Sequence, residues 1–323
     1  MVKPSVLVTR RWPAAVEAQL TETYNTVLNT GDMPMSPAEL RSALKTYDAV
    51  LPTVTDTLTA EALDLPASQT KILANYGVGY SHICEESARE LGMTVTNTPD
   101  VLSECTADLA MTLLLMAARR AGEGERELRA GGWTGWRPTH LVGTKVSGKT
   151  LGIVGFGRIG QEMARRAHHG FGMEILVQNR SRVAPDVLAQ CNAVQVDSLD
   201  DLLPKCDFVS LHCPGGTANR HLINSRRLDL MKSGAFLINT ARGEVIDEFA
   251  LIQALSFDLI GGAALDVFDG EPRISPDLLH CDNLVMLPHL GSATREAREA
   301  MGFRVLDNLD DFFQGRTPRD RVI

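Results

Sequence analysis

Residues 150–160 of this 323-residue chain join an apolar run to three closely spaced glycines, and this segment restricts the possible fold more than any other. Its letters are TLGIVGFGRIG, in which Gly155, Gly157 and Gly160 have the spacing G-x-G-x-x-G. After a strand, such glycines permit a tight turn, a close approach of the backbone to a pyrophosphate, and close packing of the next helix, here residues 161–169. The N-terminus of that helix suits an anion. The segment predicts a dinucleotide site, although an ordinary strand-to-helix turn has the same pattern.

The turn after the next expected strand indicates which dinucleotide would bind. An acidic residue that binds the adenosine ribose is expected about 20 residues after the glycines. In its place, Asn179, Arg180, Ser181 and Arg182 follow the expected strand at residues 174–178, which is apolar at 175–177. Arginine donates charge-assisted hydrogen bonds to a 2′-phosphate, and the serine adds a hydroxyl. A solvated basic turn has the same composition, but the interval from the glycines favours NADP(H) as the cofactor, with NAD(H) possible.

Length and composition favour two ordinary globular domains and exclude several classes of protein. A chain of 323 residues, 44% hydrophobic and 22% charged, can bury two cores and is not disordered. The net charge of −8 argues against a nucleic-acid partner. No secretory segment is evident, and the most apolar helical stretch, residues 109–118, is too short to span a membrane, so we expect a cytoplasmic protein. The six cysteines lack C-x-x-C or metal-ligand spacing and are expected to be free, buried thiols without a structural metal.

Alternating strand and helix patterns predict two α/β domains with parallel sheets. In the first part we expect strands near Val6 and at residues 47–51, 72–74 and 94–97, with helices between them such as 36–44 and 83–91. One long helix is expected at residues 103–129, before a loop at 131–138. Six further strands, expected at 151–154, 175–177, 208–211, 235–239, 262–265 and 284–287, suit a doubly wound domain. A final helix at 292–313 is long enough to return to the first domain.

Three residues suited to acid–base chemistry directly follow three successive expected strands. They are Arg242, Glu271 and His289. Ligands of doubly wound sheets bind at the carboxyl ends of the strands, where these side chains are expected to gather. Each residue alone is more often a surface charge or a structural hydrogen-bonding group. Their order, downstream of a nucleotide motif, favours a catalytic set for an anionic substrate.

Five ordered motifs make the chain resemble the D-isomer-specific 2-hydroxyacid dehydrogenases over nearly its whole length. They are NYGVG at 75–79, the glycine motif, NTARG at 239–243, LDVF at 265–268 followed by Glu271-Pro272, and PHLGSAT at 288–294. Within this family, residues 131–138 and 179–182 look most like the glyoxylate and hydroxypyruvate reductases. The resemblance implies a Rossmann cofactor domain of residues 101–290, a smaller flavodoxin-like substrate domain of residues 1–100 and 291–323, and a homodimer.

The resemblance assigns His289 as the acid/base, Glu271 as its partner and Arg242 as the binder of the substrate carboxylate. In the reducing direction a hydride reaches the carbonyl carbon, and the oxygen must gain a proton. A carboxylate beside the imidazole would favour its charged form and orient the ring. The planar fork of an arginine can pair with a keto acid carboxylate through two hydrogen bonds.

The same resemblance implies further contacts. Leu51, Val78, Gly79 and Trp136 would join Arg242 and His289 at the substrate, with Trp136 reaching in from the other subunit. A simple turn at Val78–Gly79 and ordinary dimer packing of Trp136 would explain the same sequence. The expected cofactor contacts are Gly155, Phe156, Gly157, Arg158, Ile159, Gly160, Asn179, Arg180, Ser181, Arg182, Thr106, Cys213, Pro214, Thr240, Ala241, Asp266 and Gly291.

Two positions depart from the family pattern. Ser81 stands where the family commonly has an acidic residue, and the turn at residues 256–258 lacks the usual glycine. Neither departure involves the three expected catalytic residues.

The sequence therefore predicts an NADPH-preferring oxidoreductase that reduces small 2-keto acids, glyoxylate to glycolate and hydroxypyruvate to D-glycerate. Two alternatives remain open. A few loop residues could redirect the pocket to bulkier 2-keto acids such as phenylpyruvates. The same scaffold could also serve a non-catalytic, NAD(P)-sensing protein similar to a corepressor.

Overall fold

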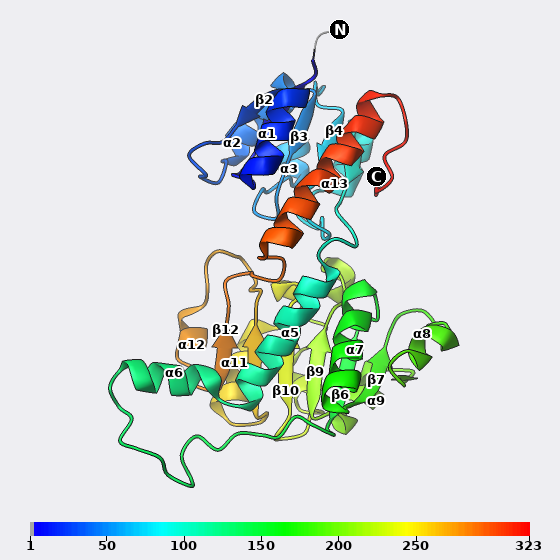
Figure 1. Ribbon diagram of the computed structural model, residues 1–323. Helices are drawn as coiled ribbons and strands as arrows, with labels where there is room; N and C mark the ends of the chain where they lie inside the picture. Colours follow the sequence, from blue (N-terminus) through cyan, green and yellow to red (C-terminus); the bar gives the residue numbers. More distant parts are fainter. Residues whose placement is uncertain (1–2) are drawn as a thin grey trace. The chain divides into compact units, whose positions relative to one another are not determined.

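The computed structural model describes residues 3–323, and within them the chain forms two compact α/β units (Figure 1). The first unit comprises the chain up to Leu102 together with Ser292–Ile323, and the second comprises Ser103–Gly291. Each unit contains one parallel sheet with helices, so the expected α/β class with two parallel-sheet domains is confirmed. The ligand that each unit binds stays a prediction.

The first unit has a five-stranded parallel sheet in the order β2-β1-β3-β4-β5. Its strands are β1 (Ser5–Val8), β2 (Asn25–Leu28), β3 (Ala49–Leu51), β4 (Ile72–Ala74) and β5 (Thr94–Thr96). Its helices are α1 (Ala14–Thr23), α2 (Pro37–Thr46), α3 (Ala60–Leu63), α4 (Glu85–Glu90) and α13 (Arg295–Phe313). This strand order is that of flavodoxin-like folds, in which ligands bind at the carboxyl ends of the strands. The edge strand β2 was not among the expected strands.

The C-terminal helix α13 completes the first unit. It begins three residues later than expected, because the Thr294 side chain accepts a hydrogen bond from Ala297 N–H and so caps the helix. The helix packs against α1 and β4. A Cβ atom on Gly302 would lie 2.6 Å from Val16 Cγ1, so a glycine is needed for the close approach of the two helices. The last residues then pair with β5, where Val322 N–H donates to Val95 O.

The second unit has a seven-stranded parallel sheet in the order β12-β11-β10-β9-β6-β7-β8. Its strands are β6 (Thr150–Val154), β7 (Glu174–Gln178), β8 (Val194–Gln195), β9 (Phe208–Leu211), β10 (Phe236–Asn239), β11 (Gly262–Leu265) and β12 (Leu284–Met286). Its helices are α5 (Ser103–Ala118), α6 (Ala121–Arg129), α7 (Arg158–Phe171), α8 (Pro185–Ala189), α9 (Leu199–Leu202), α10 (Ser225–Leu228), α11 (Glu248–Ser256) and α12 (Pro276–Leu279). The chain reverses its winding between β6 and β9, the place where doubly wound sheets bind ligands. All six expected strands are present, and β8 is added at one edge.

Two apolar clusters make the core of the second unit. One joins Leu202 of α9 and Leu251 of α11 to strand residues such as Leu237. The other joins Leu113 of α5 and Met163 of α7 to further strand residues, including Ile153. Because both faces of the sheet are covered, its strands are nearly continuous apolar runs, as parallel sheets require.

The prediction of a single helix at residues 103–129 is wrong. Helix α5 ends at Ala118 and α6 begins at Ala121, with Arg120 in the left-handed region at φ 53°. The carbonyl of Ala118 accepts a hydrogen bond of 2.7 Å from Thr144 N–H, a residue far along the chain. A Cβ atom on Gly143 would collide with the same carbonyl. A tertiary contact therefore ends the helix where the local pattern would continue it.

All six cysteines are free, but only Cys191 and Cys206 are buried. The expectation of buried thiols is therefore wrong for the four that are partly exposed, which are Cys84, Cys105, Cys213 and Cys281. Across residues 3–323, no helix has the length and apolar character that crossing a membrane requires. Within the same range, no group of three or more His, Cys, Asp or Glu side chains could hold a metal ion.

Candidate active site

The glycine turn joins β6 to α7 at the switch point of the second unit. Gly155 has φ 90°, and a Cβ atom there would lie 2.7 Å from Cys213 N, so both its conformation and its space require glycine. A Cβ atom on Gly160 would collide with the carbonyl oxygen of Gly155. By contrast, no atom lies within 4 Å of the Cβ position of Gly157, at the N-terminus of α7. The turn is thus packed on its inner side and open beside the helix N-terminus, where an anion would be stabilised.

Asn179 connects this turn to the basic residues after β7. Its Oδ1 accepts a hydrogen bond of 3.1 Å from Phe156 N–H, and its Nδ2 donates to both the carbonyl and the hydroxyl of Ser181. Arg180, Ser181 and Arg182 are exposed. The ion pair of Arg182 with Asp197 is long, at 3.6 Å, and highly exposed, so it holds the guanidinium only weakly. Both arginines are therefore accessible to an anionic ligand.

The carboxyl ends of β10 and β11 supply further polar groups. Thr240 is buried, and its hydroxyl has no hydrogen-bond partner among the described residues. Such a group costs stability unless a ligand satisfies it. Together with the open side of Gly157 and the accessible arginines, it fits a dinucleotide. The residues present in this unit therefore suit a nicotinamide cofactor.

Asp266 holds the loop that follows β12. Its two carboxylate oxygens accept hydrogen bonds of 2.6 Å from Leu290 N–H and 2.8 Å from Gly291 N–H. Its backbone carbonyl accepts from His289 N–H. Burial raises the pKa of Asp266 above its usual range, although the two N–H donors oppose this change. Asp266 is one of the expected cofactor contacts, and its carboxylate is bonded to the two N–H groups that follow His289.

His289 and Glu271 form a hydrogen-bonded pair. His289 Nδ1 lies 2.8 Å from Glu271 Oε2, and the side chains are 31% and 29% exposed, so both are screened but reachable. Glu271 Oε1 accepts a second bond from Phe268 N–H. Burial alone would raise the pKa of Glu271, but the hydrogen bond and charge of His289, the Phe268 N–H group and the charge of Arg242 together lower it. The ionised carboxylate therefore accepts the Nδ1 proton and leaves Nε2 of the ring unengaged by Glu271.

Arg242 follows β10, and its guanidinium donates to the carbonyl of Ala241 at 2.7 Å. Burial lowers the pKa of Arg242, while the charges of Glu271 and Glu244 oppose the change. Arginine stays protonated in proteins, so the side chain keeps a positive charge close to Glu271. The unit thus brings together the three residues expected for catalysis: an arginine, a carboxylate and an imidazole.

The other expected cofactor contacts of this unit lie at the same strand ends. Thr106, in the first turn of α5, is beside Gly291, whose Cβ position is 3.4 Å from Thr106 Cγ2. The remaining positions belong to the turns after β6, β9 and β10 and to the start of α7: Phe156, Arg158, Ile159, Cys213, Pro214 and Ala241.

Two residues near these strand ends were not expected to take part. The Glu244 carboxylate accepts a hydrogen bond from Gly216 N–H beside Arg242. His212 lies directly after β9 with Nε2 2.9 Å from Ser210 Oγ. Their positions just past strand ends were the only signal in the sequence.

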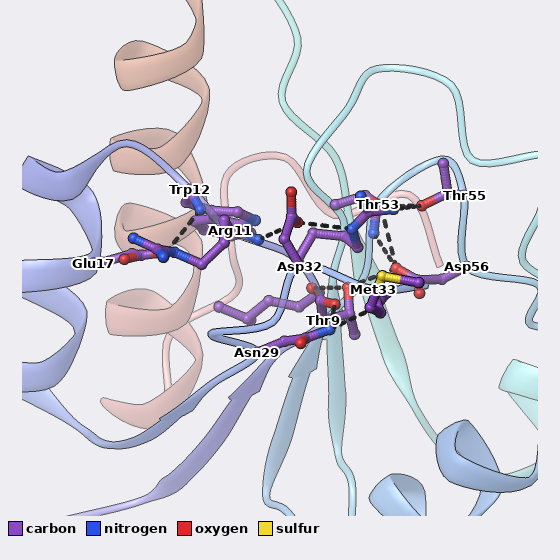
Figure 2. Close-up of polar contacts among 12 residues, drawn as sticks. Thr9, Arg11, Trp12, Glu17, Asn29, Asp32, Met33, Thr53, Thr55 and Asp56 are labelled. Carbon is purple, nitrogen blue, oxygen red and sulfur yellow. Dashed lines mark hydrogen bonds and ion pairs between the residues drawn. The ribbon is translucent and has the colours of Figure 1, made fainter. Parts of the chain in front are cut away.

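The residues expected at the substrate from the first unit lie after β3 and β4. Leu51 ends β3 and is fully buried, whereas Val78 and Gly79 are partly exposed in the loop after β4. Figure 2 shows the polar contacts that follow β1, β2 and β3, where the Asp56 carboxylate accepts from the Thr9 hydroxyl at 2.6 Å and from Thr53 N–H at 2.7 Å. These bonds fix the turn that follows Leu51.

Trp136 belongs to the second unit, in the loop after α6. Its side chain is 81% exposed, far more than the other aromatic residue of the loop, Trp133, at 53%. Large exposed aromatic side chains are typical of protein interfaces.

Comparisons of sequence and of structure with known proteins point to the same family. A family model described as D-isomer specific 2-hydroxyacid dehydrogenase, NAD binding domain, matches residues 111–291. A glyoxylate reductase of Thermococcus onnurineus is 43% identical over 321 residues, which cover 98% of this chain and 95% of that protein. A crystal structure of a putative D-isomer specific 2-hydroxyacid dehydrogenase from Polaromonas is similar with a TM-score of 0.91 and 37% identity, over 100% of both chains.

A second solved structure carries a bound cofactor. It is an NADPH-dependent glyoxylate/hydroxypyruvate reductase from Sinorhizobium meliloti in complex with NADP and malonate. Its TM-score is 0.87 at 32% identity, and the similarity covers 99% of this chain and 97% of that one.

Proposed function

The chain belongs to the D-isomer-specific 2-hydroxyacid dehydrogenases, and from this premise we propose that it is an NADPH-preferring reductase of glyoxylate and hydroxypyruvate. One observation supports the activity most directly. His289 and Glu271 are hydrogen bonded at 2.8 Å, close to the charge of Arg242, in the unit that carries the glycine turn. The names of the relatives support the choice of small 2-keto acids.

Each of the three side chains has its own part in this proposal. The bound nicotinamide cofactor supplies the hydride for the carbonyl carbon. Arg242 pairs with the substrate carboxylate and polarises the carbonyl through its charge. His289 gives a proton from Nε2 to the carbonyl oxygen as negative charge develops there, and Glu271 holds the ring by Nδ1.

The preference for NADPH is supported by the turn after β7. Arg180 and Arg182 are exposed and can donate to a 2′-phosphate, and no acidic residue stands at the end of the strand to repel it. The relative from Sinorhizobium meliloti, which is described as NADPH-dependent, agrees with this preference.

The proposal extends to the substrate loops and to a second subunit. Val78 and Gly79 supply backbone N–H groups for the substrate carboxylate, and Trp136 reaches the substrate of the partner subunit. The exposed side chains of Leu128, Trp133 and Trp136 support a homodimer, because large exposed apolar side chains are typical of protein interfaces. Light scattering of the purified protein tests the dimer.

Initial rates of cofactor oxidation test the activity. We expect fast turnover of glyoxylate and hydroxypyruvate with NADPH, slower turnover with NADH, and little with phenylpyruvate. The reverse order of substrates would favour a dehydrogenase for bulky 2-keto acids. Tight NADPH binding without turnover of any of them would favour a sensor. His289→Ala should lower kcat by about a hundredfold or more, whereas the exposed His280→Ala should not.

A further inference from the structure

We propose that Asn75 and Asn97 are positioning residues that turn the backbone N–H groups of Val78 and Gly79 toward a substrate carboxylate. This inference rests on the function proposed above and adds two side chains that the expected site lacks. Neither asparagine needs to touch the substrate, because each acts on the loop after β4.

The two asparagine amides bind three successive carbonyls of this loop. Asn75, which is fully buried, donates from Nδ2 to Gly77 O at 3.0 Å and to Gly79 O at 3.2 Å. Asn97, which is 9% exposed, donates from Nδ2 to Val78 O at 2.9 Å. The backbone N–H group of Thr98 adds a second bond to Gly77 O. All three carbonyls are thus held toward the interior of the unit.

Peptide geometry then sets the direction of the N–H groups. A trans peptide is planar, so its C=O and the N–H of the next residue point in opposite directions. With the carbonyls of Gly77 and Val78 bound by buried amides, the N–H groups of Val78 and Gly79 point away from those amides. In the described part of the chain, neither N–H group donates to another protein group. Val78 and Gly79 are also partly exposed.

Two adjacent, outward N–H groups suit a carboxylate. Successive backbone N–H groups make a small concave site for an anion, and a glycine at one position lets the ligand approach the backbone closely. An asparagine is needed at positions 75 and 97 because its side-chain amide donates hydrogen bonds to the loop carbonyls. An aspartate of the same shape would place a carboxylate against the loop carbonyls and could not donate to them.

Asn29 in the same unit is a matched control. It follows β2, and its Nδ2 donates to Thr9 O and to Met33 O, each at 2.7 Å (Figure 2). Asn29 therefore holds loop carbonyls by the same kind of hydrogen bond as Asn75 and Asn97, and its bonds are shorter than theirs. None of its bonds involves residues 77–79.

The test compares Asn75→Ala, Asn97→Ala and the isosteric Asn97→Asp with Asn29→Ala, all as full-length protein. The hydrogen bond of an N–H group to a charged carboxylate is strong, so misdirecting one should raise KM for glyoxylate about tenfold or more. The Kd for NADPH should change less than about twofold, and Asn29→Ala should leave KM unchanged. Unchanged KM in the Asn97 variants, or an equal rise in Asn29→Ala, would overturn the inference.

A second measurement separates this inference from the proposed function. Oxalate, a small dicarboxylate that accepts no hydride, is titrated into NADPH-saturated, ¹⁵N-labelled protein while the amide resonances of Val78 and Gly79 are followed. If wild-type protein reduces no 2-keto acid, the proposed function fails. The titration still tests whether the N–H groups of Val78 and Gly79 bind a carboxylate. Shifts that are present in wild type and lost in Asn97→Asp support the positioning role. Absence of shifts in wild type overturns it.

Discussion

Glu271 binds His289 with one carboxylate oxygen, at 2.8 Å from Nδ1, and binds the Phe268 N–H group with the other. The carboxylate is therefore fixed at both ends, to the imidazole and to the backbone after β11. The ring cannot rotate about its Cβ–Cγ bond without losing this contact. In the proposed reaction the pair would be a rigid support for a proton donor at Nε2.

Replacing Glu271 by Gln should alter the pH dependence of reduction. The pKa of Glu271 is lowered, so its carboxylate is ionised at neutral pH. The stability that this carboxylate contributes to the fold is complete above its ordinary pKa and is lost as the pH falls through the lowered pKa. The neutral amide removes this charge from the imidazole. We expect kcat/KM to decline at a lower pH than in wild type, with a lower kcat, because an ionised carboxylate favours the protonated ring. A pH profile of Glu271→Gln that matches wild type would contradict the assigned pair, and Glu174→Gln serves as the control.

Replacing both Arg180 and Arg182 by alanine should raise KM for NADPH more than KM for NADH. Each guanidinium is expected to donate charge-assisted bonds to the 2′-phosphate, which NADH lacks. The double alanine variant should raise KM for NADPH by about tenfold or more and change KM for NADH by less than about threefold. Arg226→Ala removes an exposed arginine of the same unit that pairs with Asp200 and should affect neither cofactor. Equal effects on both cofactors would refute the phosphate site.

Asp258→Gly should stabilise the second unit. Asp258 follows α11 with φ 53°, where Leu259 N–H donates to Ala254 O in a Schellman turn that normally has glycine. Relief of the left-handed conformation should add about 0.5–1 kcal/mol to the free energy of unfolding. The reciprocal variant Gly172→Asp, after α7 at φ 61°, should lower it by a similar amount. Urea titration of both variants checks the signs, and a loss of stability in Asp258→Gly would show that the aspartate side chain is itself needed.

His212 should make stability depend on pH. Burial lowers the pKa of His212 to about 4. Its unfolded value is near 6.5, so the unfolded chain binds more protons between these limits and stability is lost as the pH falls through this window. The loss from this group should reach at most about 3 kcal/mol. His212→Asn should reduce the difference in unfolding free energy between pH 7 and pH 4.5, whereas His280→Asn should not. Parallel curves for wild type and His212→Asn would exclude this role.

Most of the fold could be predicted because buried parallel strands are short apolar runs. Strands such as β9 and β10 are buried at every position and are evident from composition alone. The edge strand β2 alternates exposed and half-buried residues, and β8 has only two residues, so neither has this signal. The end of α5 depends on Thr144, which no local pattern contains.

The site could be predicted only as far as strand order determines it. Arg242, Glu271 and His289 follow neighbouring strands, and parallel strands carry their carboxyl ends to one edge of a sheet. The bonds of Asp266 to Leu290 and Gly291 depend on the path of the backbone after β12 and have no spacing rule. The same holds for Asn75 and Asn97, whose partners are carbonyl groups that every residue has.

The bridge made by Asn179 bears on the proposed preference for NADPH over NADH. An aspartate at this position would still accept the hydrogen bond from Phe156 N–H, but it could not donate to the carbonyl and hydroxyl of Ser181. The exchange that introduces a ribose-binding carboxylate would therefore also release the turn that carries Arg180 and Arg182. Directed evolution of cofactor use in this chain should accordingly recover paired changes at 179 and 181 more often than either change alone.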